Sequence, residues 1–425
     1  MCGFIVHAKE ESPDCTYVSR RGPDLHAKYE YDRFVFQHFL LHVTGELSPQ
    51  PLVDGGIVAV FNGEIYNFPF ARCDSENIIP AYRQAGVRFG SLLDGEFAIA
   101  LYDFEIGRAL FVTDPFGTKP LWVKGLSCAS YQSCLGGQLV PPNTWVEVQF
   151  DGTICTGSVI EFQFNRQYRR SYDSWCESFE RAVLKRYHPN SFIGLSSGYD
   201  SGAIACCLGK YNKEFRSYSI AGAEDATTLN LRVERASGAL LEVSIDEYLS
   251  TRTFIANNAE PVRYSEFSDV PLHCDNMLDD SGAVGLGLLC ARAVKDGRFV
   301  YVSGQGADEI ISDYCLDPRL TTFGGRYPEA LKPWPNFWGR CQRAYLCKEE
   351  AVGGAFGIET RYPFLDRDLV QEFLFLDSAL KNRAYKAPIL SYLYDHDYPV
   401  LRDFKVGFRA HAGLQNAPRG KSRTV

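Results

Sequence analysis

The feature that most constrains the fold of this chain is the polar segment Leu195-Ser196-Ser197-Gly198-Tyr199-Asp200-Ser201. An apolar run at 191–195 leads into it, and a second apolar run at 202–208 follows it. The pattern predicts a buried strand, a loop of small residues and a helix. Small residues let backbone N–H groups approach an anion, and a helix start adds partial positive charge. We therefore interpret the segment as a phosphate-binding loop, with a simple polar turn as the alternative. It lacks the G-x-x-x-x-G-K-[ST] pattern of a Walker loop.

Helix-like and strand-like segments alternate in the second half of the chain. Residues 175–187 have the spacing of an amphipathic helix, and residues 215–220 and 299–302 have the character of buried strands. This alternation is typical of an α/β fold with a doubly wound parallel sheet. Ligands of such sheets bind beyond the carboxyl ends of the strands. We expect the loop 196–201, Ile220 and the pair Ser303-Gly304 to surround one crevice.

Composition sets broad limits on the class of protein. A length of 425 residues favours two or three domains, and 45% hydrophobic with 23% charged residues fits a globular protein. The net charge of −8 gives no electrostatic reason to expect a nucleic-acid partner. We find no long apolar run and no leader, so we expect no membrane span and a cytoplasmic location. Fourteen cysteines then favour reduced thiols, and no paired C-x-x-C motifs indicate zinc.

The second residue, Cys2, has distinctive chemistry. A small second residue normally permits removal of Met1, and a terminal cysteine carries a thiol beside an α-amine that can serve as its base. A buried cysteine that opens a strand is the alternative. Asn62 and Gly63 follow the apolar run 57–60, so we expect them where a strand ends. There an Asn side chain and a Gly N–H can form an oxyanion hole, although Asn-Gly is also a common turn.

Further segments accompany Cys2 in the first 150 residues. They are Arg21-Gly22-Pro23-Asp24, Phe61-Asn62-Gly63-Glu64, Cys73-Asp74-Ser75-Glu76, Asp94-Gly95-Glu96-Phe97 and Asp114-Pro115-Phe116-Gly117-Thr118-Lys119-Pro120-Leu121. Together they resemble the N-terminal-nucleophile glutaminase domain of class II glutamine amidotransferases. The resemblance implies an α+β domain with αββα layers over 2–155, in which Cys2 attacks the glutamine amide and releases ammonia. It assigns the oxyanion hole to Asn62 and Gly63, and glutamine binding to Asn62, Glu64 and Asp74.

The second half carries four more ordered segments. They are Ser303-Gly304-Gln305-Gly306-Ala307-Asp308-Glu309, Gly357-Ile358-Glu359-Thr360-Arg361-Tyr362-Pro363-Phe364-Leu365-Asp366, Lys386-Ala387-Pro388-Ile389-Leu390 and Lys405-Val406-Gly407-Phe408. With the loop at 195–201 they resemble the asparagine synthetases, and the loop itself resembles that of the PP-loop ATP pyrophosphatases, with Ser197 in place of a Gly. The resemblance implies a synthetase domain over 172–415 that adenylates a carboxylate, releases pyrophosphate and receives ammonia through an internal tunnel.

The same resemblance distributes roles among the residues of that domain. Lys386 would stabilise charge on the α-phosphate, and Asp200 and Asp308 would hold Mg²⁺, a hard cation that prefers carboxylate oxygens. The residues implied for ATP binding are Leu195, Ser196, Ser197, Gly198, Asp200, Ser201, Ile220, Ser303 and Gly304. The alternatives are structural: Asp308 as a helix cap, Lys386 as an exposed helix lysine, and Arg361 with Asp366 as an internal pair.

Two departures from the family pattern bear on the substrates. Leu40 stands where the family has the Arg that pairs with the glutamine carboxylate, and Arg20, Arg21 and Arg33 are candidates to replace it. Gln305 stands where the family has an ionised Glu, which keeps the shape and loses the charge.

Four functions follow as hypotheses. The first is a glutamine-dependent, ATP-hydrolysing asparagine synthetase that converts aspartate to asparagine in amino-acid biosynthesis. The second applies the same chemistry to another carboxylate, such as a sugar acid or a peptide, and Gln305 favours it. The third is a glutaminase-like hydrolase with an inactive synthetase half, and the fourth a silent scaffold. The expected partners are glutamine, ATP and the carboxylate acceptor, with a second copy of the chain as a homodimer.

Overall fold

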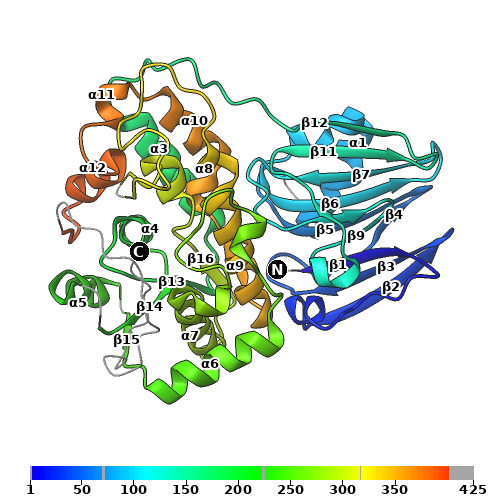
Figure 1. Cartoon of the computed structure of the whole chain (residues 1–425), viewed down its shortest axis with the longest axis horizontal. Helices are drawn as coiled ribbons and strands as arrows, with labels where there is room; N and C mark the ends of the chain where they lie inside the picture. Colours follow the sequence, from blue (N-terminus) through cyan, green and yellow to red (C-terminus); the bar gives the residue numbers. More distant parts are fainter. Residues whose placement is uncertain (1, 69–71, 223–224, 237, 316, 402–425) are drawn as a thin grey trace, which may run out of the picture.

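The computed structural model describes residues 2–68, 72–222, 225–236, 238–315 and 317–401, and it has two structurally different halves. Two antiparallel sheets are stacked in the N-terminal half, and helices surround a parallel sheet in the C-terminal half (Figure 1). None of the helices in the described ranges combines the length and apolar character that crossing a membrane requires. The segment 405–408 and the expected domain limit at 415 lie outside the described residues.

The two N-terminal sheets have six strands each. The strand orders are β10-β8-β9-β1-β3-β2 and β12-β11-β7-β6-β5-β4. The bounds are β1 Gly3–Ala8, β2 Leu25–Tyr31, β3 Phe34–Leu40, β4 Leu52–Asp54, β5 Ile57–Ile65, β6 Gly95–Asp103, β7 Arg108–Thr113, β8 Trp122–Lys124, β9 Ser127–Ala129, β10 Gln138–Leu139, β11 Thr144–Gln149 and β12 Ile154–Ser158. The predicted domain limit at 155 thus falls inside β12.

A shared core joins the two sheets, because alternate residues of their strands point inward. Phe4, Phe36, Val60 and Ala100 belong to this core and are almost fully buried. Helix α1 (Ile78–Ala85) packs on the outer face of the second sheet. The outer face of the first sheet carries only a short layer among the described residues, formed by the 3₁₀ turn η1 (Val18–Arg21) and α2 (Gln132–Leu135). The expected αββα layering is therefore thin on that side.

Asn62 and Gly63 do not end a strand, which corrects the sequence-based expectation. Both lie inside β5, opposite Ala98 and Phe97 of β6. Gly63 has φ +137°, and a Cβ there would meet the carbonyl oxygen of Glu96 at 1.8 Å. The Asn-Gly pattern therefore reflects close strand pairing and not a turn, because only glycine fits this approach.

The C-terminal sheet has five parallel strands in the order β15-β14-β13-β16-β17. The bounds are β13 Ser191–Gly194, β14 Arg216–Ile220, β15 Ala239–Leu241, β16 Val300–Val302 and β17 Glu359–Arg361. The chain extends the sheet outward from β13 in one direction and then returns to add β16 and β17 on the other side. The strand order therefore reverses between β13 and β16, which is where open α/β sheets form their ligand crevice.

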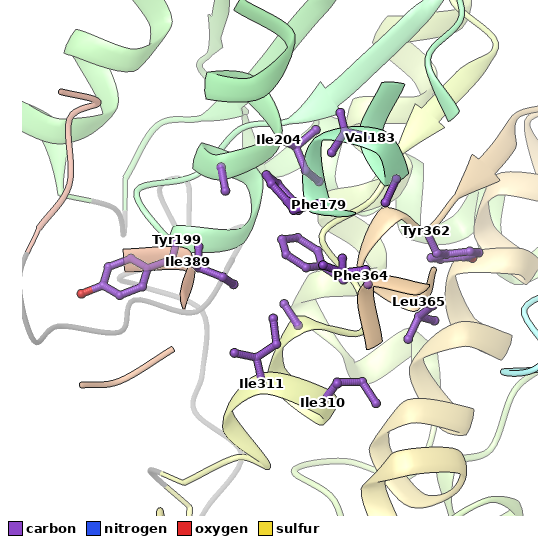
Figure 2. Packing of buried hydrophobic residues seen from close by; sticks show 14 of the residues in the cluster. Phe179, Val183, Tyr199, Ile204, Ile310, Ile311, Tyr362, Phe364, Leu365 and Ile389 are labelled. Atoms are coloured by element: carbon purple, nitrogen blue, oxygen red, sulfur yellow. The ribbon is translucent and has the colours of Figure 1, made fainter. Parts of the chain in front are cut away.

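Helices cover both faces of this sheet. Their bounds are α3 Asp173–Arg186, α4 Tyr199–Lys210, α5 Ala226–Arg235, α6 Ile245–Asn258, α7 Ser281–Lys295, α8 Pro335–Trp338, α9 Arg340–Ala355, α10 Arg367–Phe375, α11 Ser378–Lys381 and α12 Ala387–Asp395. Phe192 of β13 joins the core beneath α6, α7 and α9, whereas Ile193 joins the core beneath α3, α4, α10 and α12. Figure 2 shows part of the core that contains Ile193, where Phe179 stacks on Phe364 with ring centroids 5.2 Å apart. The expected strands and helices of this half are confirmed to within a few residues.

Candidate active sites

Cys2 lies immediately before β1 and lines a small pocket of about 40 Å³ in the N-terminal half. Its thiol is 3.8 Å from the carbonyl oxygen of Leu41, and its own carbonyl oxygen accepts a hydrogen bond from Nε of Arg21 at 2.8 Å. Burial raises the pKa of the Cys2 thiol to about 11, so the thiol is neutral until a base takes its proton. Cys2 is half-buried directly before β1 and reaches the pocket, and its role as nucleophile stays a prediction. None of the fourteen cysteines forms a disulfide.

The expected oxyanion-hole pair adjoins this pocket. Gly63 lines it, while the fully buried Asn62 is absent from its lining. Among the described residues, neither polar atom of the Asn62 amide has a hydrogen-bond partner. An orphaned buried amide is costly in a folded protein, and a catalytic role is one of the explanations for it. The oxyanion role stays a prediction.

Two of the expected glutamine-binding residues, Glu64 and Asp74, line the same pocket. Asp74 begins the 3₁₀ turn η2 (Asp74–Asn77) and accepts a hydrogen bond from the N–H of Ile65 at 2.8 Å. Glu64 lies 2.9 Å from the guanidinium group of Arg361. Burial raises the pKa of Glu64 to about 8 and that of Asp74 to about 6.

None of the proposed substitutes for the missing arginine lines this pocket. Arg21 is fully buried and is bound to Cys2 and to Glu350 of α9, 2.8 Å from each. Arg33 lies over the rings of Phe34 and Phe150, and Arg20 is exposed. Leu40 itself lines the pocket.

A second and larger pocket, of about 310 Å³, opens at the carboxyl ends of β13 and β16. Ser196, Asp200 and Ser201 reach it from the loop and from the first turn of α4, and Ser303 and Gly304 reach it from the loop after β16. A Cβ on Gly304 would lie 3.0 Å from that of Asp200, so these two segments are in close contact. The strand reversal thus gathers five of the nine residues predicted for ATP binding into one crevice.

Lys386 joins the two carboxylates expected to bind metal. Its Nζ lies 2.6 Å from Asp200 and 2.9 Å from Asp308. Lys386 is buried just before α12, with a left-handed backbone (φ +48°), and is not an exposed helix lysine. Burial acts to lower its pKa, but Asp200 and Asp308 outweigh this effect and raise it, so the ammonium group stays charged. Two neighbouring carboxylates suit Mg²⁺, which proteins usually hold with one or two carboxylates plus phosphate oxygens and water.

Four residues assigned to ATP binding do not line this pocket: Leu195, Ser197, Gly198 and Ile220. Leu195 and Ile220 are core residues on opposite faces of the sheet, because apolar side chains at strand ends pack inward. Gly198 precedes α4 and supports the loop, since its N–H donates to Ser196 Oγ at 3.1 Å.

Sequence reasoning missed Arg232 of α5, which holds the loop from behind. Its guanidinium group is completely buried and donates to the carbonyl oxygens of Ser196 and Gly198, each at 2.6 Å. These bonds fix the backbone of the loop beside the crevice. An isolated arginine 31 residues after the loop offers no sequence signal for this role.

A charged cluster at another part of the large pocket was also missed. Asp280 accepts a hydrogen bond from Tyr264 at 2.6 Å and lies 3.3 Å from His273 and 3.5 Å from Lys348. The hydrogen bond to Asp280 raises the pKa of His273 to about 9, so the ring is cationic at neutral pH. His273, Asp280 and Lys348 all line the pocket.

Gln305 and two glutamates complete the lining. Glu309 accepts hydrogen bonds from the Gln305 amide at 2.7 Å and from the Tyr314 hydroxyl at 2.6 Å. Glu349 of α9 accepts one from Ser303 at 2.7 Å, and burial raises the pKa of Glu349 to about 7. Gln305 thus occupies the expected place with a neutral side chain.

Arg361 and Asp366 do not pair with each other, which corrects the expectation of an internal pair. Arg361 binds Glu64 at 2.9 Å and Glu359 at 2.6 Å, and Asp366 binds Arg186 at 2.8 Å. Each side chain is buried. The segment 357–366 therefore takes part in two ion networks, one of which reaches the Cys2 pocket through Glu359.

Two protein-family models match separate parts of the chain. A glutamine amidotransferase domain model matches residues 1–143, and an asparagine synthase model matches residues 176–335. The chain is thus an amidotransferase domain followed by a synthetase domain. It belongs to the asparagine synthetase family.

Two curated relatives illustrate the similarity. A probable glutamine-hydrolysing asparagine synthetase of Schizosaccharomyces pombe is 25% identical over 430 residues, covering 89% of this chain and 76% of the relative. A putative one of Methanocaldococcus jannaschii is 28% identical over 408 residues, covering 82% and 71%. A solved glutamine phosphoribosylpyrophosphate amidotransferase of B. subtilis aligns with 46% of this chain and 60% of its own, at 15% identity and a TM-score of 0.30.

Proposed function

We propose that this protein is a glutamine-hydrolysing amide ligase that consumes ATP, with an N-terminal-nucleophile glutaminase half and a PP-loop synthetase half. The observation that carries the proposal is the Lys386 bridge between Asp200 and Asp308 in a crevice formed by two phosphate-binding segments. A chain with only a glutaminase activity, or a silent scaffold, has no need of a buried lysine between two carboxylates beside such loops.

The first half-reaction takes place at Cys2. With Met1 removed, the α-amine of Cys2 takes the proton from the thiol, and Sγ attacks the side-chain amide carbon of glutamine. The Gly63 N–H and the Asn62 amide stabilise the oxyanion, the C–N bond breaks, and ammonia leaves with the proton. Water then hydrolyses the thioester and releases glutamate, while Asp74 holds the amino group of the substrate throughout.

The second half-reaction takes place in the large pocket. The loop 196–201 binds the phosphates of ATP, and an acceptor carboxylate attacks the α-phosphorus so that pyrophosphate leaves. Lys386 stabilises the negative charge that accumulates on the α-phosphate oxygens. Mg²⁺ held by Asp200 and Asp308 would supply further neutralisation of phosphate charge. Ammonia from the Cys2 pocket replaces AMP on the activated carboxyl group and forms the amide.

Glu349 is the best-placed proton acceptor for this last step. Gln305 is neutral and Glu309 is engaged by Gln305 and Tyr314. Glu349 faces the same pocket and accepts a bond from Ser303, and its other carboxylate oxygen has no donor among the described residues. A carboxylate with a pKa near the working pH is suited to take a proton from attacking ammonia.

The acceptor is aspartate on the family's pattern, and a different carboxylate is the second candidate. Gln305 favours the second. The cationic pair His273 and Lys348 around Asp280 suits an acceptor with one more anionic than cationic group, and aspartate is one such acceptor.

The test is product analysis by mass spectrometry after incubation with ATP, Mg²⁺, side-chain ¹⁵N-glutamine and a panel of carboxylic acids. We expect one acid to gain labelled amide nitrogen together with AMP and pyrophosphate. Cys2→Ala should abolish glutamine-dependent synthesis and spare ammonia-dependent synthesis, with Cys155→Ala on the exposed β12 as the control. Equal loss of both activities in Cys2→Ala would contradict the two-site proposal.

A further inference from the structure

The Cys2 pocket is lined by acids and, in the part of the chain that the structure describes, by no lysine or arginine. The four carboxylates are those of Glu46, Glu64, Asp74 and Glu359. Glu46 is on the exposed rim, whereas the other three are buried. Leu40 presents an apolar surface to the same pocket.

The nearest cations are committed to other partners. Arg361 is buried and does not line the pocket, and its guanidinium group forms ion pairs with Glu64 and Glu359. Arg21 is held by Glu350, and Arg72 forms an exposed ion pair with Glu76 at 2.5 Å. Among the described residues, these four acidic side chains have one arginine between them, which leaves an acidic pocket without a lysine or arginine for a substrate carboxylate.

This charge has opposite consequences for the two ends of free glutamine. Its α-ammonium group is attracted to Asp74 and Glu46, whereas its α-carboxylate meets an acidic wall with no partner. Burial already raises the pKa of Glu64 to about 8 and that of Asp74 to about 6, so the pocket resists further negative charge. A donor that keeps the amine and lacks the carboxylate avoids this repulsion.

We propose that the preferred donor at Cys2 has a free α-ammonium group and an uncharged α-carbonyl group, as in the N-terminal glutaminyl residue of a peptide or in glutamine α-amide. The inference rests on the proposed function, because it assigns the donor class of the same nucleophile. The bond broken and the ammonia released stay the same: Sγ attacks the side-chain amide, ammonia leaves, and water returns a glutamyl side chain.

The direct test compares donors on the unmodified protein. Free glutamine, glutamine α-amide and glutaminylglycine, each ¹⁵N-labelled in the side-chain amide, are assayed for release of labelled ammonia. We expect kcat/KM for both neutral donors to exceed that for free glutamine by about tenfold or more. Equal or better use of free glutamine overturns this inference and leaves the proposed function intact. If none of the donors is hydrolysed, the proposed function fails as well.

Restoring the missing cation should reverse the preference. Leu40→Arg should raise kcat/KM for free glutamine about tenfold with little change for glutamine α-amide, because an arginine binds the carboxylate. Leu40→Met keeps the apolar surface and should keep the original preference. If Leu40→Arg does not fold, Glu46→Gln on the rim serves instead, and it should improve use of free glutamine selectively. Glu10→Gln, away from the pocket, is its control. An unchanged donor ratio in a folded Leu40→Arg protein contradicts the inference.

Discussion

The guanidinium group of Arg21 lies 2.8 Å from Oε2 of Glu350, although the two residues belong to different halves of the chain. Arg21 also binds the carbonyl oxygen of Cys2, and Oε1 of Glu350 accepts a hydrogen bond from Lys119 at 2.9 Å. All of these side chains are almost completely buried. Figure 1 shows α9, which carries Glu350, running along the border between the two halves. Cys2 is therefore positioned partly by the synthetase half.

Glu350→Gln tests this arrangement. It keeps the shape but leaves two buried cations without their carboxylate, so we expect a loss of about 3–5 kcal/mol of unfolding free energy. Urea unfolding measures the change. Glu30→Gln removes a carboxylate from an exposed pair and should change stability by less than about 1 kcal/mol. Equal losses of unfolding free energy in Glu350→Gln and Glu30→Gln would show that the buried ion pair stabilises the protein no more than the exposed one. In the folded fraction, amide hydrolysis should fall more than ammonia-dependent synthesis.

Lys386→Met should slow pyrophosphate formation by about 100-fold or more, because it removes the charge that stabilises the reacting phosphate. Asp200→Asn and Asp308→Asn should also block AMP and pyrophosphate formation. Pyrophosphate release in a single turnover is the measurement, with the exposed Lys332→Met as the control. Full release from any of the three variants would remove that residue from its assigned role. Hydrolysis of the donor amide at Cys2 should continue in all three.

The pH dependence of amide formation should report on Glu349. A proton acceptor works only when deprotonated, so the rate should rise with pH and reach half its plateau near pH 7, the value to which burial raises the pKa of this carboxyl. Rates are expressed against the concentration of unprotonated ammonia, so that the slope reflects the enzyme. Glu349→Gln should lower the plateau and flatten this limb. If the rate of the Glu349→Gln variant depends on pH with the same slope, another group is responsible for the titration.

Acid stability should depend on Asp366. Burial acts to raise its pKa, but Arg186 and Lys185 outweigh this and lower it to about 2. Its stabilising contribution is complete above the unfolded-state pKa of about 3.9 and is lost as the pH falls through about 2, which corresponds to roughly 2–3 kcal/mol. Asp366→Asn should therefore destabilise the protein at pH 7, and the gap to the unmodified chain should close in acid. Thermal unfolding from pH 7 to pH 2 tests this, with the exposed Asp151→Asn as a control. A gap that stays constant in acid would mean that ionisation of Asp366 contributes nothing.

Local sequence patterns predicted the parts of the fold that local chemistry determines. The small-residue loop at 196–201, its flanking strand and helix, and the crevice shared with Ser303 and Gly304 were all predicted. The pattern at Asn62 and Gly63 misled because the same dipeptide suits a turn and a closely paired strand, and only the partner strand decides between them.

Residues that act across the fold were beyond the reach of local patterns. Arg232, His273 and Lys348 reach the loop or the pocket through the packing of helices and loops far apart in sequence, and no spacing rule links them. Leu195 and Ile220 were predicted to bind the nucleotide because they lie at strand ends. Successive side chains at a strand end alternate between the core and the crevice, and these two side chains lie in the core. Lys386 was identified from its motif alone, and its carboxylate partners lie 186 and 78 residues away along the chain.

Glu349 and Glu350 are consecutive residues of α9, and about 100° of helical rotation turns one toward Ser303 and the other toward Arg21. Two carboxylates that are adjacent in the sequence therefore lie toward two different pockets. Losing or gaining one residue upstream in this helix would rotate both carboxylates by about 100° and turn at least one of them away from its present partner. Any engineered exchange of halves between relatives must keep this helix as an undivided unit.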